Sequence, residues 1–210
     1  MNKRLLAFYA LIAVSIIGLT FFVENYPISS FDLRVTREIQ EQRDWDPTLL
    51  MKFISSFGNT VVASLSIIIA SSLFYLSYRR REAYFTLGVV LPDMVNMLIK
   101  LLVHRPRPTT VDAKILLTFS QTGFPSGHVV HYVVFFGFLL AVMILDKTIA
   151  LFWRIVVAGF SSFLIVTVSV SRIYLGAHWV TDVIGGYLFG LAYLGIILWY
   201  YLKDPKFRRS

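Results

Sequence analysis

The sequence predicts an all-α integral membrane protein, a single domain over residues 1–210 built as a bundle of six transmembrane helices. Three observations lead to this fold class. The chain is 57% hydrophobic and 15% charged, whereas soluble globular chains are about 45–50% apolar and about 25% charged. Its mean hydropathy is +0.69, and its apolar residues gather in stretches of roughly the 20 residues that cross a bilayer. This composition excludes a disordered chain and a soluble nucleic-acid-binding protein, and the absence of cysteine excludes a disulfide scaffold.

Six apolar stretches are long enough to cross a hydrocarbon core of about 30 Å, and they are residues 5–23, 60–78, 83–103, 126–145, 149–170 and 180–202. The first stretch follows Lys3 and Arg4, as the apolar region of a signal peptide does. It is longer than the usual signal-peptide core of about 7–15 residues, and no small-x-small cleavage site follows it. We therefore expect it to remain as a transmembrane helix.

The third stretch is interrupted by polar residues and a proline, namely Pro92, Asp93, Asn96 and Lys100. Ionisable residues at membrane depth are costly and by default indicate function. Lys100 alone could instead extend its ammonium group to the membrane interface. The helical spacing of Asp93 and Asn96 before Lys100 predicts that they hold its ammonium group, with polar packing between helices as the alternative.

The longest connection, residues 24–59, predicts two amphipathic helices. Ser30 is a suitable N-cap for the first helix, and the second runs from Thr48 to Phe57. The first helix has apolar residues on one face and charged residues on the other, and these are Phe31, Val35, Ile39, Arg34, Glu38 and Glu41. Such helices are typical of segments that rest on a membrane. The pattern leaves open whether the first helix does so or covers a site as an ordered cap.

The basic residues predict the orientation of the bundle. Eleven of the 20 Lys and Arg residues lie at the chain ends or in the two turns on the same side, and they are Lys3, Arg4, Arg79, Arg80, Arg81, Lys147, Arg154, Lys203, Lys206, Arg208 and Arg209. The positive-inside rule places this side, with both termini, in the cytoplasm. The net charge of +8 is then explained by orientation and by contact with anionic lipids, and we expect no nucleic-acid partner.

With six spans, parity places three polar segments on the opposite, extracytoplasmic side, namely residues 100–108, 124–128 and 171–182. They bring three cations, Lys100, Arg107 and Arg172, to one membrane face. Guanidinium and ammonium groups suit phosphate oxygens, and a transferring phosphoryl group spreads its negative charge over three of them. The three segments therefore predict a site for a phosphoryl group.

The second segment adds an anion cradle and the third adds a candidate nucleophile. In Pro125-Ser126-Gly127-His128 a helix begins, so its free backbone N–H groups point at a ligand, and Gly127 permits close backbone approach. His178 and Asp182 are four residues apart at a helix start, so the carboxylate can hold one ring nitrogen and leave the other free to attack. His128 supplies a second imidazole that can protonate a leaving oxygen.

Each of these features alone has an ordinary explanation. A loop arginine is usually solvated or bound to lipid headgroups, a histidine at a span boundary is usually interfacial, and Pro-Ser-Gly is a common helix start. Their convergence on one face indicates a site. His131 lies three residues after His128, but with cations crowding the segment and no carboxylate in it we expect a packing or supporting role, not a metal site. His104 and Arg105 are expected to line the entrance.

The three segments together resemble a known signature. K-x6-R-P from Lys100 to Pro108, P-S-G-H from Pro125 to His128 and S-R-x5-H-x3-D from Ser171 to Asp182 are similar to the three motifs of the type 2 phosphatidic acid phosphatase superfamily. That group includes membrane lipid phosphate phosphatases and bacterial phosphatidylglycerophosphate and undecaprenyl-diphosphate phosphatases. Every signature position is matched in order, and the six-span layout resembles the membrane branch over nearly the whole chain.

The resemblance implies a role for each signature residue. His178 would attack phosphorus and become a phosphohistidine, oriented by Asp182, while His128 would protonate the leaving group and then activate water. The phosphoryl oxygens would be held by Lys100, Arg107, Ser126, the Gly127 N–H and Arg172. No metal and no cofactor are expected, because cations can replace the divalent ion as charge stabilisers.

The expected activity is hydrolysis of a lipid phosphate or diphosphate that enters laterally from the bilayer, on the extracytoplasmic side of a bacterial plasma membrane. The residues do not distinguish phosphatidylglycerophosphate, phosphatidate and undecaprenyl diphosphate, and they leave the oligomeric state open. A lipid phosphotransferase with the same intermediate is an alternative. Two further alternatives are not enzymes. One is a transporter, which Asp93 and Lys100 within a span would suit, and the other is a scaffold.

Overall fold

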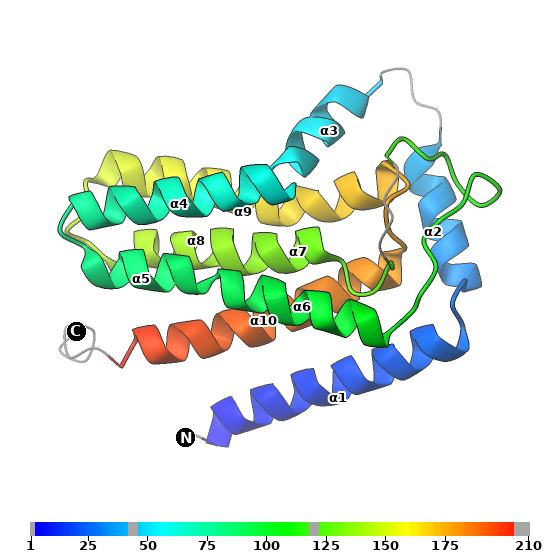
Figure 1. Ribbon diagram of the computed structural model, residues 1–210, viewed down its shortest axis with the longest axis horizontal. Helices are drawn as coiled ribbons and strands as arrows, with labels where there is room; N and C mark the ends of the chain where they lie inside the picture. Colours follow the sequence, from blue (N-terminus) through cyan, green and yellow to red (C-terminus); the bar gives the residue numbers. More distant parts are fainter. Residues whose placement is uncertain (1–2, 42–45, 118–121, 204–210) are drawn as a thin grey trace.

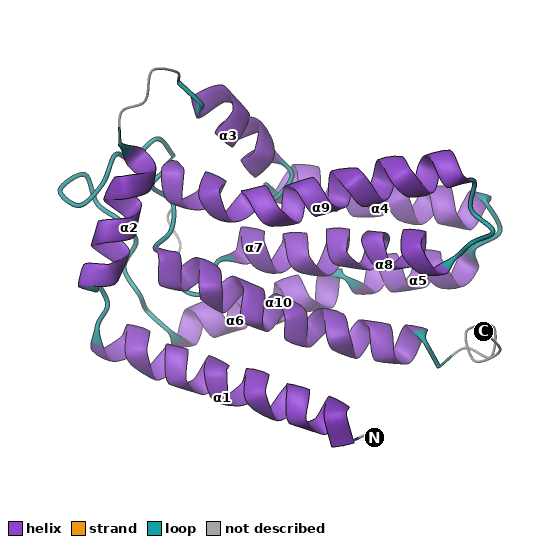
Figure 2. Cartoon of the chain, turned by 180° about the vertical axis from the view of Figure 1, so that it is seen from behind, coloured by secondary structure: helices purple, strands orange, loops and turns teal. Residues whose placement is uncertain are grey.

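The computed structural model describes residues 3–41, 46–117 and 122–203, and within these ranges the regular elements are all helices. They are α1 (Lys3–Asn25), α2 (Ser30–Gln40), α3 (Thr48–Ser56), α4 (Thr60–Leu76), α5 (Arg80–Gly88), α6 (Val90–Leu102), α7 (Gly127–His131), the π-helical turn η1 (Tyr132–Phe136), α8 (Gly137–Leu145), α9 (Leu151–Tyr174) and α10 (Val180–Tyr201). The long helices run side by side, while α2 crosses one end of the bundle (Figure 1). Figure 2 shows the same arrangement from behind. The basic tail residues Lys206, Arg208 and Arg209 lie outside the described residues.

The predicted class, an all-α membrane bundle, is confirmed. Five helical stretches are long and apolar enough to cross a membrane, and they are Leu5–Asn25, Arg80–Leu102, Gly127–Leu145, Leu151–Tyr174 and Val180–Tyr201. The second predicted span, residues 60–78, begins at residue 60 as expected, but α4 has only 17 residues. It reaches span length only together with α3, from which it is bent by 54°. Helices α1 and α10 have their chain-terminal ends opposite α2, as do the turns after α4 and α8 (Figure 1).

The third span is broken between α5 and α6. A turn at Val89 separates the two helices. Pro92 explains the position of the break, because it has no N–H to donate to the carbonyl of Gly88, four residues earlier. Beyond this turn, α6 carries Asn96 and Lys100, and both residues are buried.

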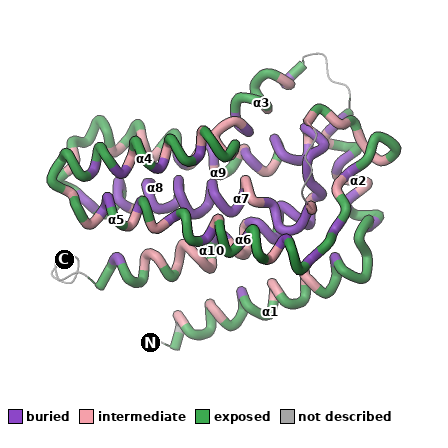
Figure 3. The backbone as a smooth tube through the Cα atoms, viewed as in Figure 1, coloured by how far each residue is buried: buried purple, intermediate pink, exposed green. Residues whose placement is uncertain are grey.

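The fourth span is the centre of the bundle. In the most apolar stretch of this span 67% of the residues are buried, against 11–28% in the corresponding stretches of the other four spans. Figure 3 shows this contrast between α7–α8 and the exposed α1. Two glycines allow α10 to approach it closely, since a Cβ on Gly186 or Gly190 would lie 2.7 Å from the Cβ of Val129 or Val133. The central helix carries His128 of the second motif and also His131, so its packing sets their position.

Helix α2 is an ordered cap held by a polar stripe. Its N-cap is Ser29, one residue before the predicted Ser30, and the Ser29 hydroxyl accepts a hydrogen bond from the Asp32 N–H at 3.1 Å. Asp32, Thr36 and Gln40 are buried, whereas the apolar residue Phe31 is 49% exposed. The helix therefore docks on the bundle through polar groups and leaves Phe31 on its outer side.

Candidate active site

The three motif segments converge at the end of the bundle that α2 covers. They line a cavity of about 600 Å³ between α4, α6, α7 and the end of α9. Six of the eight predicted site residues line it, and they are Lys100, Arg107, Gly127, His128, Arg172 and His178. The other two, Ser126 and Asp182, are fully buried directly beside these residues. The structure thus brings all eight together.

His178 is held between a carboxylate and a guanidinium group. Its Nδ1 lies 3.3 Å from Oδ2 of Asp182, and its Nε2 lies 3.3 Å from Nη1 of Arg107. The carboxylate accepts the Nδ1 proton and the guanidinium donates to Nε2, so both contacts favour the same neutral tautomer. Burial, followed by the nearby Arg107 and Arg172, holds the pKa of His178 well below its usual value. The ring is therefore neutral at pH 7, and its Nε2 lone pair accepts from Arg107 at the wall of the cavity.

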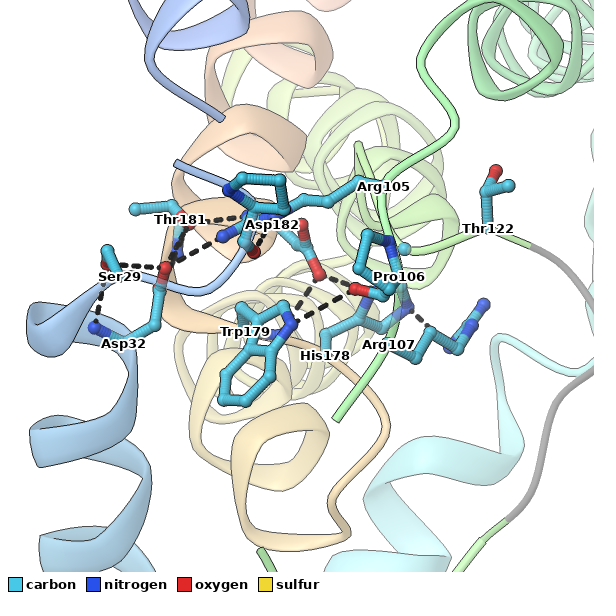
Figure 4. Close-up of polar contacts among 12 residues, drawn as sticks. Ser29, Asp32, Arg105, Pro106, Arg107, Thr122, His178, Trp179, Thr181 and Asp182 are labelled. Carbon is cyan, nitrogen blue, oxygen red and sulfur yellow. Dashed lines mark hydrogen bonds and ion pairs between the residues drawn. The ribbon is translucent and has the colours of Figure 1, made fainter. Parts of the chain in front are cut away.

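Asp182 is itself fixed by groups that the motif does not include. Its Oδ2 accepts the Trp179 N–H at 3.0 Å, as the N3 residue of a capped helix does, and its Oδ1 accepts Nη1 of Arg105 at 2.7 Å. Arg105 also donates to Asp32 at 2.7 Å and to Thr181 at 2.5 Å. Figure 4 shows Arg105 between the two carboxylates. This buried network ties the cap helix α2 to the start of α10.

The expectation that Arg105 lines the entrance is therefore wrong, because its side chain is fully buried in two ion pairs. Burial alternates over residues 103–106, with exposed His104 beside buried Arg105, and the chain turns tightly here because the Arg105 N–H donates to the Val103 carbonyl at 2.9 Å. His104 is not among the cavity-lining residues either. No local spacing indicates this role, because its partners Asp32 and Thr181 lie 73 and 76 residues away in the sequence.

The three cations are positioned by neutral oxygen atoms. Lys100 donates to the Thr122 carbonyl at 2.8 Å, Arg107 to the Ala177 carbonyl at 2.6 Å, and Arg172 to the Ser55 hydroxyl at 2.5 Å. Neutral acceptors hold the side chains in place without cancelling their charge, which suits a site for an anion. Burial lowers the pKa of Arg107 to about 10, so it stays charged at neutral pH.

Asp93 does not hold the Lys100 ammonium group, contrary to the sequence expectation. It is paired with Nδ1 of His131 at 2.9 Å, because it lies two turns deeper along α6, beside the next turn of the central helix. His131 also stacks on Phe135, with ring centroids 5.4 Å apart. Within the described ranges, no group of three His, Asp or Glu residues could hold a metal ion.

Two glycines place the backbone against the site. A Cβ on Gly127 would lie 3.3 Å from the Asn96 amide nitrogen, and a Cβ on Gly58 would lie 2.3 Å from Cδ2 of His128. The backbone of the connection between α3 and α4 therefore packs directly against the His128 ring, and this contact is not predicted from the sequence. The buried Ser126 hydroxyl makes no hydrogen bond to the described residues, while its backbone N–H donates to the Asp182 carbonyl at 3.0 Å.

Three comparisons with known proteins bear on this site. A family model described as the PAP2 superfamily matches residues 81–206. The chain is 29% identical over 164 residues to phosphatidylglycerophosphatase B of Bacillus subtilis, covering 77% of this chain and 78% of the relative.

Two solved structures share the fold. The crystal structure of a transmembrane PAP2-type phosphatidylglycerolphosphate phosphatase from Bacillus subtilis matches with a TM-score of 0.81 at 21% identity, over 95% of this chain and 98% of that one. The crystal structure of Aquifex aeolicus LpxE matches with a TM-score of 0.60 at 20% identity, over 80% of this chain and 94% of that one.

Proposed function

This chain belongs to the PAP2 superfamily and is a membrane lipid phosphatase, and we propose that it releases orthophosphate from a lipid phosphate or diphosphate through a phosphohistidine on His178. The observation that carries the proposal is the contact of His178 with Asp182 on one nitrogen and Arg107 on the other. That arrangement places a neutral imidazole nitrogen at a cavity lined by three cations, where a bound phosphoryl group would draw Arg107 away from Nε2 and free its lone pair for attack.

In the first step Nε2 of His178 attacks phosphorus, and the bond from phosphorus to the leaving oxygen breaks. His128 gives its proton to that oxygen, so the lipid leaves as a neutral alcohol, or as a phosphate when the substrate is a diphosphate. Charge that develops on the phosphoryl oxygens is met by Lys100, Arg107 and Arg172, together with the Ser126 hydroxyl and the Gly127 N–H. Asp182 stabilises the positive charge that forms on the His178 ring.

In the second step a water molecule attacks the phosphohistidine. His128, now without its proton, accepts one from this water, the phosphorus–nitrogen bond breaks, and orthophosphate leaves. His178 returns to its neutral state with the Nδ1 proton still directed at Asp182. The residues then stand as they did at the start of the cycle.

Substrate would enter from the bilayer between α4 and α6. The cavity continues from the cations to apolar residues of α6, of which Val90, Met94 and Met97 are 41%, 60% and 57% exposed. A lipid could keep its acyl chains in the membrane beside these residues while its headgroup reaches the cations. The name of the Bacillus relative makes phosphatidylglycerophosphate the first substrate to test, with phosphatidate and undecaprenyl diphosphate beside it.

The test is phosphate release by the purified protein in detergent with excess EDTA. Wild-type protein should turn over short-chain lipid phosphates, vanadate should inhibit it, and His178→Ala should abolish turnover. Retained turnover in His178→Ala would exclude the proposed nucleophile, and loss of wild-type activity with EDTA would indicate a metal enzyme.

We also propose that the site faces outward from the cytoplasm, because the basic turns and both chain-terminal helix ends lie at the opposite end of the bundle (Figure 1). A cysteine at the exposed Thr110 should react with an impermeant maleimide on intact cells. Labelling only after lysis would reverse this topology.

A further inference from the structure

The cavity contains a second polar cluster that the three motifs do not use. It consists of Asp93 and Asn96 on α6 and His131 on α7, and all three residues line the same cavity as the cations. Asn96 and His131 are each 3% exposed, whereas the Asp93 side chain is 34% exposed toward the cavity. Buried polar groups in a membrane span are costly and indicate function.

The cluster contains polar atoms without a hydrogen-bond partner among the described residues. In the contact at 2.9 Å, Nδ1–H of His131 donates to the carboxylate of Asp93. Nε2 of His131 and Oδ1 of Asn96 are buried and make no hydrogen bond to the described residues. The Asp93 carboxylate and the Asn96 carbonyl oxygen are acceptors in the lining of the same cavity as the unpaired His131 nitrogen, and a ligand hydroxyl, which both donates and accepts, can satisfy them.

The position of the cluster relates it to the leaving group. Asn96 and Asp93 precede Lys100 by four and seven residues, which is about 6 and 10 Å along the helix. His131 is one turn beyond His128, the proposed acid. The leaving oxygen must lie at His128, on the far side of phosphorus from His178, so the rest of the leaving group extends past this cluster toward the apolar end of the cavity.

We propose that Asp93, Asn96 and His131 form a subsite for a hydroxyl group on the leaving alcohol. The inference rests on the proposed function and specifies its substrate class, which is a lipid phosphomonoester of glycerol type with a free hydroxyl beside the scissile ester. A diphosphate fits poorly, because its leaving phosphate presents acceptor oxygens to acceptors and negative charge to Asp93. Buried acceptors left without a donor discriminate strongly against an analogue that lacks the hydroxyl.

The test compares kcat/KM for two matched substrates in detergent micelles. One is short-chain phosphatidylglycerophosphate, and the other carries propane-1,3-diol in place of the headgroup glycerol, so that only the hydroxyl is missing. Wild-type protein should prefer the first by about tenfold or more, and it should prefer it over farnesyl diphosphate as well. Asp93→Asn and Asn96→Leu should each reduce the hydroxyl preference to within about threefold of unity, whereas Val95→Leu, an exposed position of α6 outside the cavity lining, should preserve it.

The ratio of kcat/KM for the two substrates in wild-type protein is the first test, because it does not depend on whether a variant folds. Equal kcat/KM for the hydroxyl and deoxy substrates in wild type would overturn the subsite. So would an unchanged ratio in both active variants. If His178→Ala abolishes turnover while the ratio shows no hydroxyl preference, the phosphohistidine mechanism stands and the subsite fails. If His178→Ala retains both turnover and the preference, the mechanism fails and the subsite stands.

Discussion

Arg105 is predicted to be the positioning residue that holds the Asp182–His178 pair in register. Its guanidinium group donates to Asp182, Asp32 and Thr181, and also to the Pro27 carbonyl at 3.0 Å. The substitution Arg105→Lys keeps the charge but offers one nitrogen where the guanidinium group places three. It can therefore satisfy one carboxylate and not both.

The expected cost follows from the burial of the network. Arg105, Asp32 and Asp182 each have a side chain with no exposed surface, and breaking a buried ion pair by removing one partner costs about 3–5 kcal/mol. Total stabilities are about 5–15 kcal/mol, so Arg105→Met should lower the thermal midpoint markedly. In the folded fraction, a carboxylate displaced by about 1 Å should reduce kcat roughly 100-fold.

The assay measures thermal unfolding in detergent together with kcat and KM for Arg105→Lys and Arg105→Met. A positioning role predicts that kcat falls while KM changes little, since the group does not touch substrate. Asp32→Asn is the matched variant, because it removes the other carboxylate that is paired with the Arg105 guanidinium group and leaves the ion pair of Arg105 with Asp182 in place. It should destabilise the protein with a smaller loss of kcat. An Arg105→Lys protein with kcat within about twofold of wild type would refute the reasoning.

Two further predictions concern the two histidines. Gly58→Ala should reduce kcat roughly 10- to 100-fold, because its Cβ would lie 2.3 Å from the His128 ring, whereas Gly18→Ala, with nothing within 4 Å, should not; equal rates for both would contradict the contact. For His178, the lowered pKa means that below about pH 6.5 the unfolded chain binds a proton that the folded chain does not, so the free energy of unfolding should fall as pH falls. Thermal midpoints between pH 7.5 and 5.5 should drop less in His178→Gln than in wild type, and parallel drops would count against the neutral buried ring.

The spans were predictable because they depend on local composition. A helix of about 20 apolar residues is stable mainly within a membrane. The predicted spans 5–23 and 180–202 correspond closely to the helical stretches Leu5–Asn25 and Val180–Tyr201. The close contact of His178 with Asp182 was predictable for a similar reason, since four residues on a helix are one turn apart. The break at Val89 follows from a single proline.

What the sequence determined by itself is the membrane class, the positions of the spans and the chemistry gathered at one face, all of which depend on residue type and short spacing. What only the tertiary structure decided is which distant residues support that chemistry. Asp32 lies 73 residues from Arg105, and Ser55 lies 117 residues from Arg172. Asp93 likewise pairs with His131, which lies 38 residues away on another helix, and not with Lys100 on its own helix. Partners so far apart meet only through helix packing, which neither composition nor periodicity encodes.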